Sequence, residues 1–355
     1  MNIQEIITNA RQSGILYNVN LEKTSLTGVD FSSLRLEKVN FSNTNLIGAN
    51  FDGSLLSNVD FTNAKLQGTQ FDQSIIQDSN FSNSTLQNSS MQSANFNKCN
   101  FSNADLTSVN GANTHFINCE LIKTKLIGAN LSASTWSNVV IRSTDFSNAD
   151  LYRLMAYDMV FESSTFNNTN LTKSQFNGSE FIGYKFTNCI LLMSSFDTCN
   201  LKKSDFTNLD LTQVNFNNAN LENTNFLNSS GEYTSFIASN ALKANFCNSV
   251  FNMSNFTKAT LSYTNLVNAK ITNSIFEYSD LSFANFTNAQ LDYTNFSNAI
   301  TQQTNFDQAR LYYANLHGIK QAKLDRALKL GTAFKTDPEL VEASNWRPLR
   351  NLPNR

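Results

Sequence analysis

Residues 49–53 read Ala-Asn-Phe-Asp-Gly, and residues 219–223 read Ala-Asn-Leu-Glu-Asn. Both stretches have the order small residue, Asn or Asp, Leu or Phe, and two polar residues. Steps of five from Leu21 to Leu316 meet sixty positions in one unbroken frame, and fifty of them hold Leu or Phe. The other ten are Ile76, Met91, Gly111, Trp136, Ile141, Ala156, Gly231, Ala241, Ile271 and Thr301. A frame of this length is not chance, so a five-residue unit organises the chain.

A period of five fits neither an α-helix nor a strand. Apolar residues at this spacing would drift around a helix of period 3.6 and would change faces in a strand of period 2. The backbone must therefore turn once in each unit, and four right-angled turns close a coil of twenty residues. Sixty units make fifteen such coils, which at about 4.8 Å per coil would form a rod roughly 70 Å long.

Residues twenty apart should then stack in columns. Two columns consist of Phe alone, namely Phe176, Phe196, Phe216, Phe236, Phe256, Phe276, Phe296 and Phe146, Phe166, Phe186, Phe206, Phe226, Phe246. The column that starts at Gly28 holds mainly Gly and then, from Asn148 to Asn288, only Asn. Both residue types tolerate positive φ, so we expect this column to mark a left-handed corner, with Asn amides bonded along the axis.

The repeat resembles that of the pentapeptide-repeat family, whose units follow the pattern Ala-(Asp/Asn)-Leu-x-x. The resemblance covers residues 19–318 and implies a right-handed quadrilateral β-helix. We therefore expect an all-β solenoid of about fifteen 20-residue coils with short α-helical caps. The expected divisions are an N-terminal, partly helical cap at 1–15, the β-helix at 16–318, a helical cap at 319–346 and a basic tail at 347–355. Helical spacing of apolar residues places the cap helices at residues 2–11 and 319–330.

Residues for catalysis are scarce. The two histidines, His115 and His317, fall some ten coils apart, and no Gly-rich phosphate loop is present. Four cysteines occupy the small inward position, namely Cys99, Cys119, Cys189 and Cys199, whereas Cys247 points outward. Cys99 and Cys119 are neighbours in one column, at a distance that would permit a disulfide, although the lack of a secretion signal favours reduced thiols. We expect no enzyme, cofactor or metal site.

Charge is low throughout the sequence. Charged residues make up 15% and the net charge is −2, which offers no attraction to nucleic acid or to an anionic membrane. The N-terminus lacks a basic start and an apolar run, and no segment approaches 18 consecutive apolar residues. We predict a cytoplasmic protein without a membrane span. Export without a cleaved signal stays open.

Exposed aromatic residues towards the C-terminal end provide the candidate interaction surface. It consists of Tyr233, Tyr263, Tyr278, Phe283, Tyr293, Tyr312 and Tyr313. Steps of twenty put Tyr233, Tyr293 and Tyr313 in one column and Tyr263 with Phe283 in another, and Tyr278 and Tyr312 join them. Aromatic side chains on so polar a surface indicate a contact site for another protein or for a second copy at the end of the rod. The alternative is that these are scattered tyrosines without a partner. The resulting hypothesis is a non-enzymatic scaffold that binds another macromolecule through its surface.

The family resemblance implies two further hypotheses. Some members imitate duplex DNA and bind DNA gyrase or another topoisomerase, and others are delivered into host cells as effectors. Imitation requires a dense line of carboxylates, and the acids here are sparse along one face, namely Asp30, Asp52, Asp72, Asp150, Asp210 and Asp292. Duplex DNA carries one charge per roughly 1.7 Å. For this reason the protein-binding scaffold is preferred.

Overall fold

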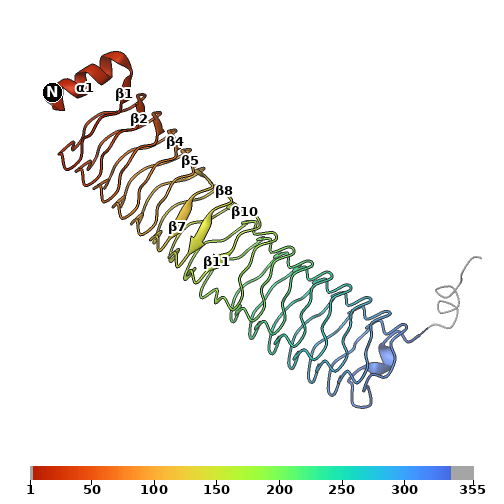
Figure 1. Cartoon of the computed structure of the whole chain (residues 1–355). Coiled ribbons are helices and arrows are strands. Elements are labelled where there is room, and N and C mark those ends of the chain that lie inside the picture. Colours follow the sequence, from red (N-terminus) through yellow and green to blue (C-terminus); the bar gives the residue numbers. More distant parts are fainter. Residues whose placement is uncertain (1–2, 337–355) are drawn as a thin grey trace, which may run out of the picture. The chain divides into compact units, whose positions relative to one another are not determined.

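A computed structural model of the protein describes residues 3–336 (Figure 1). The chain divides into two compact units, residues 1–215 and 216–355. In both units the backbone winds into stacked coils, because residues twenty apart form parallel bridges at four places in each coil. In the first unit these include Asn20↔Asn40, Ser25↔Asn45 and Asp30↔Asn50. In the second they include Asn220↔Asn240, Asn225↔Asn245, Ser230↔Val250 and Ser235↔Asn255.

The regular strands all lie in the first unit. After helix α1 (Ile3–Ser13), an eight-stranded parallel sheet contains β1 (Ile15–Tyr17), β2 (Arg35–Glu37), β3 (Leu55–Ser57), β4 (Ile75–Gln77), β5 (Asn95–Asn97), β6 (His115–Ile117), β8 (Thr135–Ser137) and β10 (Met155–Ala156). A three-stranded sheet contains β7 (Glu120–Ile122), β9 (Val140–Arg142) and β11 (Phe161–Glu162). Neighbouring strands are twenty residues apart, as in Ile15↔Arg35.

These pairings confirm the four-sided, all-β solenoid. Regular strand structure is less extensive than fifteen coils would give, because the eight-stranded sheet accounts for about seven turns, from Ile15 to Met155 in steps of twenty. The other described coils close through single bridges. No α-helix interrupts residues 20–316, as the five-residue period requires.

The core of each unit consists of the Leu/Phe positions and the small residues beside them. Every position of the five-residue frame from Leu21 to Leu316 is buried. Rings one coil apart stack nearly parallel: Phe256 lies 4.6 Å from Phe236 and 4.5 Å from Phe276 between ring centroids. Buried hydroxyls at the small positions donate to backbone carbonyls, as Thr44 does to Leu21 at 2.8 Å. The core is therefore apolar at its centre and internally hydrogen-bonded at its margin.

Left-handed corners are more numerous than the sequence indicated. Every residue whose number ends in 3 or 8, from Asn18 to Gly318, has positive φ. The column from Gly28 to Asn288 is confirmed as a corner, and its Asn amides bond along the axis, as Asn268 does to Asn248 at 3.0 Å. The other three corners escaped prediction because they hold side chains of all kinds. Side chains of all kinds are tolerated at these corners because they point outward. The cost of each left-handed L-residue then stays local, at about 1–2 kcal/mol.

The two ends differ from each other. The predicted N-terminal helix is present as α1, in which Ala10 is buried and the Arg11 guanidinium donates to the carbonyl of Ser32 at 3.2 Å. The predicted helix at residues 319–330 is wrong. That segment forms a further, shortened coil, with bridges Asn305↔Lys323, Arg310↔Leu328 and Asn315↔Phe334.

The physical reason for this correction is that the backbone of the preceding coil offers unpaired groups at its edge. Residues 18 or 19 positions further along the chain form bridges with these groups. A free helix would leave the same groups without hydrogen-bond partners. The only helical turn there is the 3₁₀ turn η1 (Leu330–Thr332). Of the remainder of the predicted cap, the structure describes residues 331–336. Residues 337–346 and the predicted tail at 347–355 lie outside the described residues.

Candidate interaction surface

Six of the seven predicted aromatic residues occupy left-handed corners of the second unit. They are Tyr233, Tyr263, Tyr278, Phe283, Tyr293 and Tyr313, with φ between 51° and 60°. All six are exposed, from 41% for Tyr313 to 55% for Tyr233 and Tyr278. Tyr312 precedes a corner and is half-buried. Their placement follows from the fold, because a corner side chain points away from the coil.

Four aromatic rings meet at one corner near the end of the described residues. Tyr293 and Tyr313 are one coil apart and stack at 5.7 Å with an interplanar angle of 15°. Tyr312 stands edge-on to both, at 5.6 Å from Tyr293 and 4.5 Å from Tyr313. Phe334, 58% exposed, lies 6.0 Å from Tyr313. We call these four residues the corner cluster.

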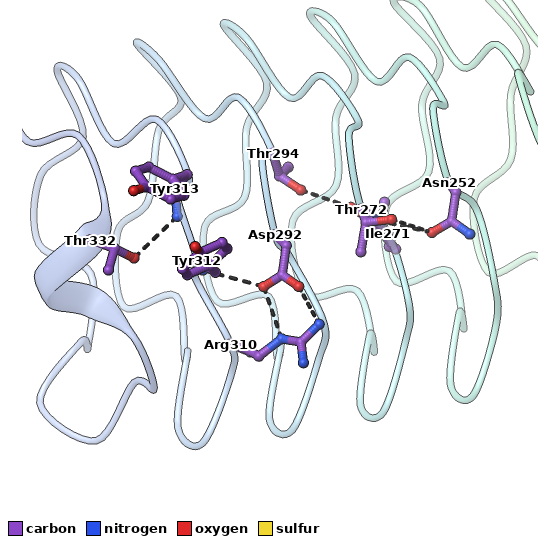
Figure 2. Close-up of polar contacts among 9 residues, drawn as sticks. All are labelled: Asn252, Ile271, Thr272, Asp292, Thr294, Arg310, Tyr312, Tyr313 and Thr332. Atoms are coloured by element: carbon purple, nitrogen blue, oxygen red, sulfur yellow. Dashed lines mark hydrogen bonds and ion pairs between the residues drawn. The ribbon is translucent and has the colours of Figure 1, made fainter.

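Two residues of the corner cluster, Tyr312 and Tyr313, have backbone groups held by polar contacts (Figure 2). The Arg310 guanidinium forms an ion pair with Asp292, with Nε donating to Oδ1 at 2.9 Å. The same Oδ1 accepts the backbone N–H of Tyr312 at 3.3 Å, and Thr332 Oγ1 accepts that of Tyr313 at 3.2 Å. Tyr313, together with burial, raises the pKa of the Tyr312 hydroxyl.

The seven predicted residues lie at or beside several separate corners of the coil. Tyr263 and Phe283 stack on each other at 4.8 Å and 7°. Their column is offset by ten residues from that of Tyr293, so in a coil of twenty it occupies the opposite corner. Tyr278 lies at the corner between them, and Tyr233 is three coils from Tyr293 in the same column. The structure therefore gathers Tyr293, Tyr312 and Tyr313 and separates the others.

Phe334 was missed by sequence reasoning. It belongs to the segment after Gly331, outside the five-residue frame, where the sequence predicted only a helical cap and a tail. Its spacing from the preceding coil could have indicated it, because an apolar residue 18 to 20 positions after an outward-facing coil residue can pair with that coil. Asn315↔Phe334 is such a bridge.

The acids required for DNA mimicry are individually engaged. Asp52 Oδ1 accepts the backbone N–H of Asp72 at 2.8 Å, and Asp72 Oδ1 accepts that of Gln92 at 2.7 Å. Asp30 is paired with Arg11, and Asp292 with Arg310. Asp150 and Asp210 accept N–H groups two residues further on, those of Tyr152 and Thr212. These carboxylates cap backbone groups of the coil, and two of them are neutralised by arginine.

The residues weighed for catalysis lie in different units or are buried. His115 lies on β6 in the first unit, and His317 lies in the second. All five cysteines are free thiols, and four are buried, namely Cys99, Cys119, Cys189 and Cys199. Burial raises the pKa of Cys189 and Cys199 to about 12. Within residues 3–336, no group of three or more His, Cys, Asp or Glu side chains could hold a metal ion.

Family models match most of the repeat frame. The model "Pentapeptide repeat region" matches residues 15–91 and 89–176, and "Pentapeptide repeats (8 copies)" matches 194–230, 242–277, 264–300 and 289–320. Together these cover more than half of the chain. The chain belongs to the pentapeptide-repeat family. Members fold as right-handed quadrilateral β-helices, so the expected handedness holds for this pentapeptide-repeat protein.

Solved structures with the same repeat are similar only at low identity. They include QnrB1, described as a plasmid-mediated fluoroquinolone resistance protein, with 16% identity over 53% of this chain and 93% of that one, at a TM-score of 0.32. HetL from Nostoc sp. strain PCC 7120, described as involved in heterocyst differentiation regulation, has 18% identity over 93% and 98%, at a TM-score of 0.21. At these scores the likenesses say nothing about what this pentapeptide-repeat protein binds.

No protein of curated function matches the sequence. Neither α1 nor any other helix in the described part of the chain has the length and hydropathy that a membrane span requires.

Proposed function

We propose that this pentapeptide-repeat protein is a non-catalytic scaffold that binds another protein through the corner cluster. The observation that carries the proposal is the meeting of Tyr293, Tyr312, Tyr313 and Phe334 at one place on the surface. Aromatic residues dominate the binding energy of protein interfaces, and they do so where several lie together beside satisfied polar groups. The Asp292–Arg310 pair and the two backbone bonds supply that polar surround.

The polar contacts also limit the entropy that binding would cost. Tyr293, Tyr312 and Tyr313 are in mutual contact, and the N–H groups of the last two are fixed by Asp292 and Thr332. Rings already held in place lose little rotamer freedom on association, whereas isolated tyrosines such as Tyr278 would lose more. The corner cluster is thus the better anchor among the exposed aromatics of this unit.

The test compares two double variants with identical chemistry. Tyr293→Asn with Tyr313→Asn removes the stacked pair, and Tyr263→Asn with Tyr278→Asn removes two other exposed tyrosines of the same unit. Asn is frequent at these left-handed corners, so both variants should fold. Proteins retained from a native lysate are quantified on immobilised wild type and both variants, and affinity is then measured with the purified partner.

We expect the corner variant to bind the partner about a hundredfold more weakly, since two anchor residues at 1–2 kcal/mol each are lost. The control variant should bind within about twofold of wild type. Sedimentation of the protein alone distinguishes a second copy from a different partner. Equal retention by both variants would refute the proposal, as would loss of binding by the control alone.

A further inference from the structure

A second surface, made entirely by the first unit, differs in character from the corner cluster. It is a groove of about 560 Å³ lined by Ala133, Arg153, Met155, Lys173, Gln175 and Met193. Ala133, Arg153, Lys173 and Met193 follow one another at intervals of twenty along one left-handed corner, with φ between 55° and 59°. Met155 and Gln175 come from the neighbouring column. The groove therefore runs along successive coils.

The groove lining carries two positive charges and no negative one, in a chain whose net charge is −2. Neither Arg153 nor Lys173 belongs to an ion pair among residues 3–336. The carboxylate closest in sequence, Asp150, is engaged elsewhere, since Oδ1 accepts the backbone N–H of Tyr152 at 3.1 Å and Asn170 Nδ2 at 2.8 Å. Two like charges one coil apart repel each other, and an anionic ligand would remove that cost.

Both cations rest on the same aromatic ring. Arg153 Cζ and Lys173 Nζ each lie 5.8 Å from the centroid of Tyr152. In cation–π contacts of this kind the ring attracts the positive charge, and this attraction restricts the rotamers of a long side chain. The two charged groups are therefore positioned before any ligand arrives, which favours binding.

Apolar side chains complete the lining. Met155 is 38% exposed and Met193 is 47% exposed, and the Tyr157 hydroxyl donates to Gln175 Oε1 and orients that amide. Exposed methionines adapt to apolar side chains of varied shape. A bare phosphate would leave them unused, whereas a peptide that alternates acidic and apolar residues would contact both parts of the groove.

We propose that this groove binds a short acidic segment of a protein partner in extended conformation. Carboxylates at positions i and i+2 of such a segment lie about 7 Å apart on one side, while successive coils are about 4.8 Å apart. The long side chains of Arg153 and Lys173 can span this difference, so each pairs with one carboxylate. Successive side chains of an extended segment point to opposite sides, so the intervening apolar residue faces Met155 in the neighbouring column. A residue that follows on the carboxylate side faces Met193, one coil beyond Lys173.

The test uses the full chain and a fluorescein-labelled peptide, Glu-Leu-Glu-Leu-Glu-Leu, titrated by fluorescence anisotropy at low and moderate salt. Arg153→Asn with Lys173→Asn removes the two cations at corners that accept Asn. Lys98→Asn with Lys123→Asn makes the same charge change at two other exposed left-handed corners of this unit. Met193→Asn removes apolar contact alone.

We expect saturable binding that weakens with salt, that falls at least about tenfold in the Arg153/Lys173 variant and that stays within about twofold in the Lys98/Lys123 variant. Met193→Asn should weaken it by about three- to fivefold. Absence of saturable binding, equal losses in both double variants, or equal binding of a Lys-Leu peptide would overturn the proposal. Tighter binding of pyrophosphate or single-stranded DNA than of the acidic peptide would also overturn it, in favour of a phosphate site.

Discussion

Phe256 lies between two nearly parallel rings, and its replacement measures what the stacked column contributes to stability. Its centroid is 4.6 Å from Phe236 at 5° and 4.5 Å from Phe276 at 1°, and the side chain is fully buried. Phe256→Leu keeps the other apolar residue that the repeat places at these positions but removes both stacked contacts. At about 0.5–1.5 kcal/mol for each ring pair beyond burial, the free energy of unfolding should fall by about 1–3 kcal/mol.

Phe256→Ala provides the second point of the series. It removes the same contacts and leaves a cavity, so the loss should reach about 3–5 kcal/mol. Urea unfolding followed by far-UV circular dichroism measures both, with the exposed corner variant Lys258→Asn as a control expected within about 0.5 kcal/mol of wild type. A Leu variant that loses less than about 0.5 kcal/mol, or as much as the Ala variant, would refute the view that ring stacking stabilises the column.

Three further predictions follow from the other groups described. Burial and then the carboxylates of Asp72 and Asp30 raise the pKa of Asp52 above 3.8, so the ionised form destabilises the fold. Asp52→Asn should therefore raise the urea midpoint at pH 7, and this gain should disappear below about pH 4; a gain that grows towards acid would contradict it. In the native protein a disulfide reagent at pH 8 should titrate Cys247 alone, and all five thiols after denaturation, because the others are buried. In a gyrase supercoiling assay we expect no salt-sensitive inhibition or drug protection, because the carboxylates already cap backbone groups; either effect would restore the DNA-mimic hypothesis.

The repeat could be predicted because it is local and redundant. A five-residue frame excludes helix and strand on geometry alone, and the stacked Phe columns reveal the coil of twenty. Three corners escaped because Lys, Ser, Met and Tyr alternate there with Asn and Gly, so that no single property of the column indicates positive φ. The last coil escaped for a different reason. Ala322, Leu324, Ala327 and Leu328 satisfy a helical spacing as well as a shortened coil, and the unpaired edge that decides between them is not visible in the sequence.

The candidate surface was predicted only in part. Columns of twenty correctly brought Tyr293 and Tyr313 together and set Tyr263 with Phe283 in a second column, but they did not indicate that the second column occupies the opposite corner. The basic groove was missed because Arg153 and Lys173 are twenty residues apart, and each alone is an ordinary exposed cation. Their shared contact with Tyr152 and the lack of an acid in the groove lining emerge only when the coils are stacked.

The corner Asn column also bears on the low charge of the chain. A coil of twenty repeats the same position one step along the axis, so each outward group faces a copy of its own position. An amide is complementary to itself, since it donates to one neighbour and accepts from the other, as Asn268 does between Asn248 and Asn288. A carboxylate or an ammonium group is not, and a column of either would repel along its whole length. Translational repetition therefore selects for uncharged polar residues, and a pair such as Arg153 and Lys173 stands against that selection.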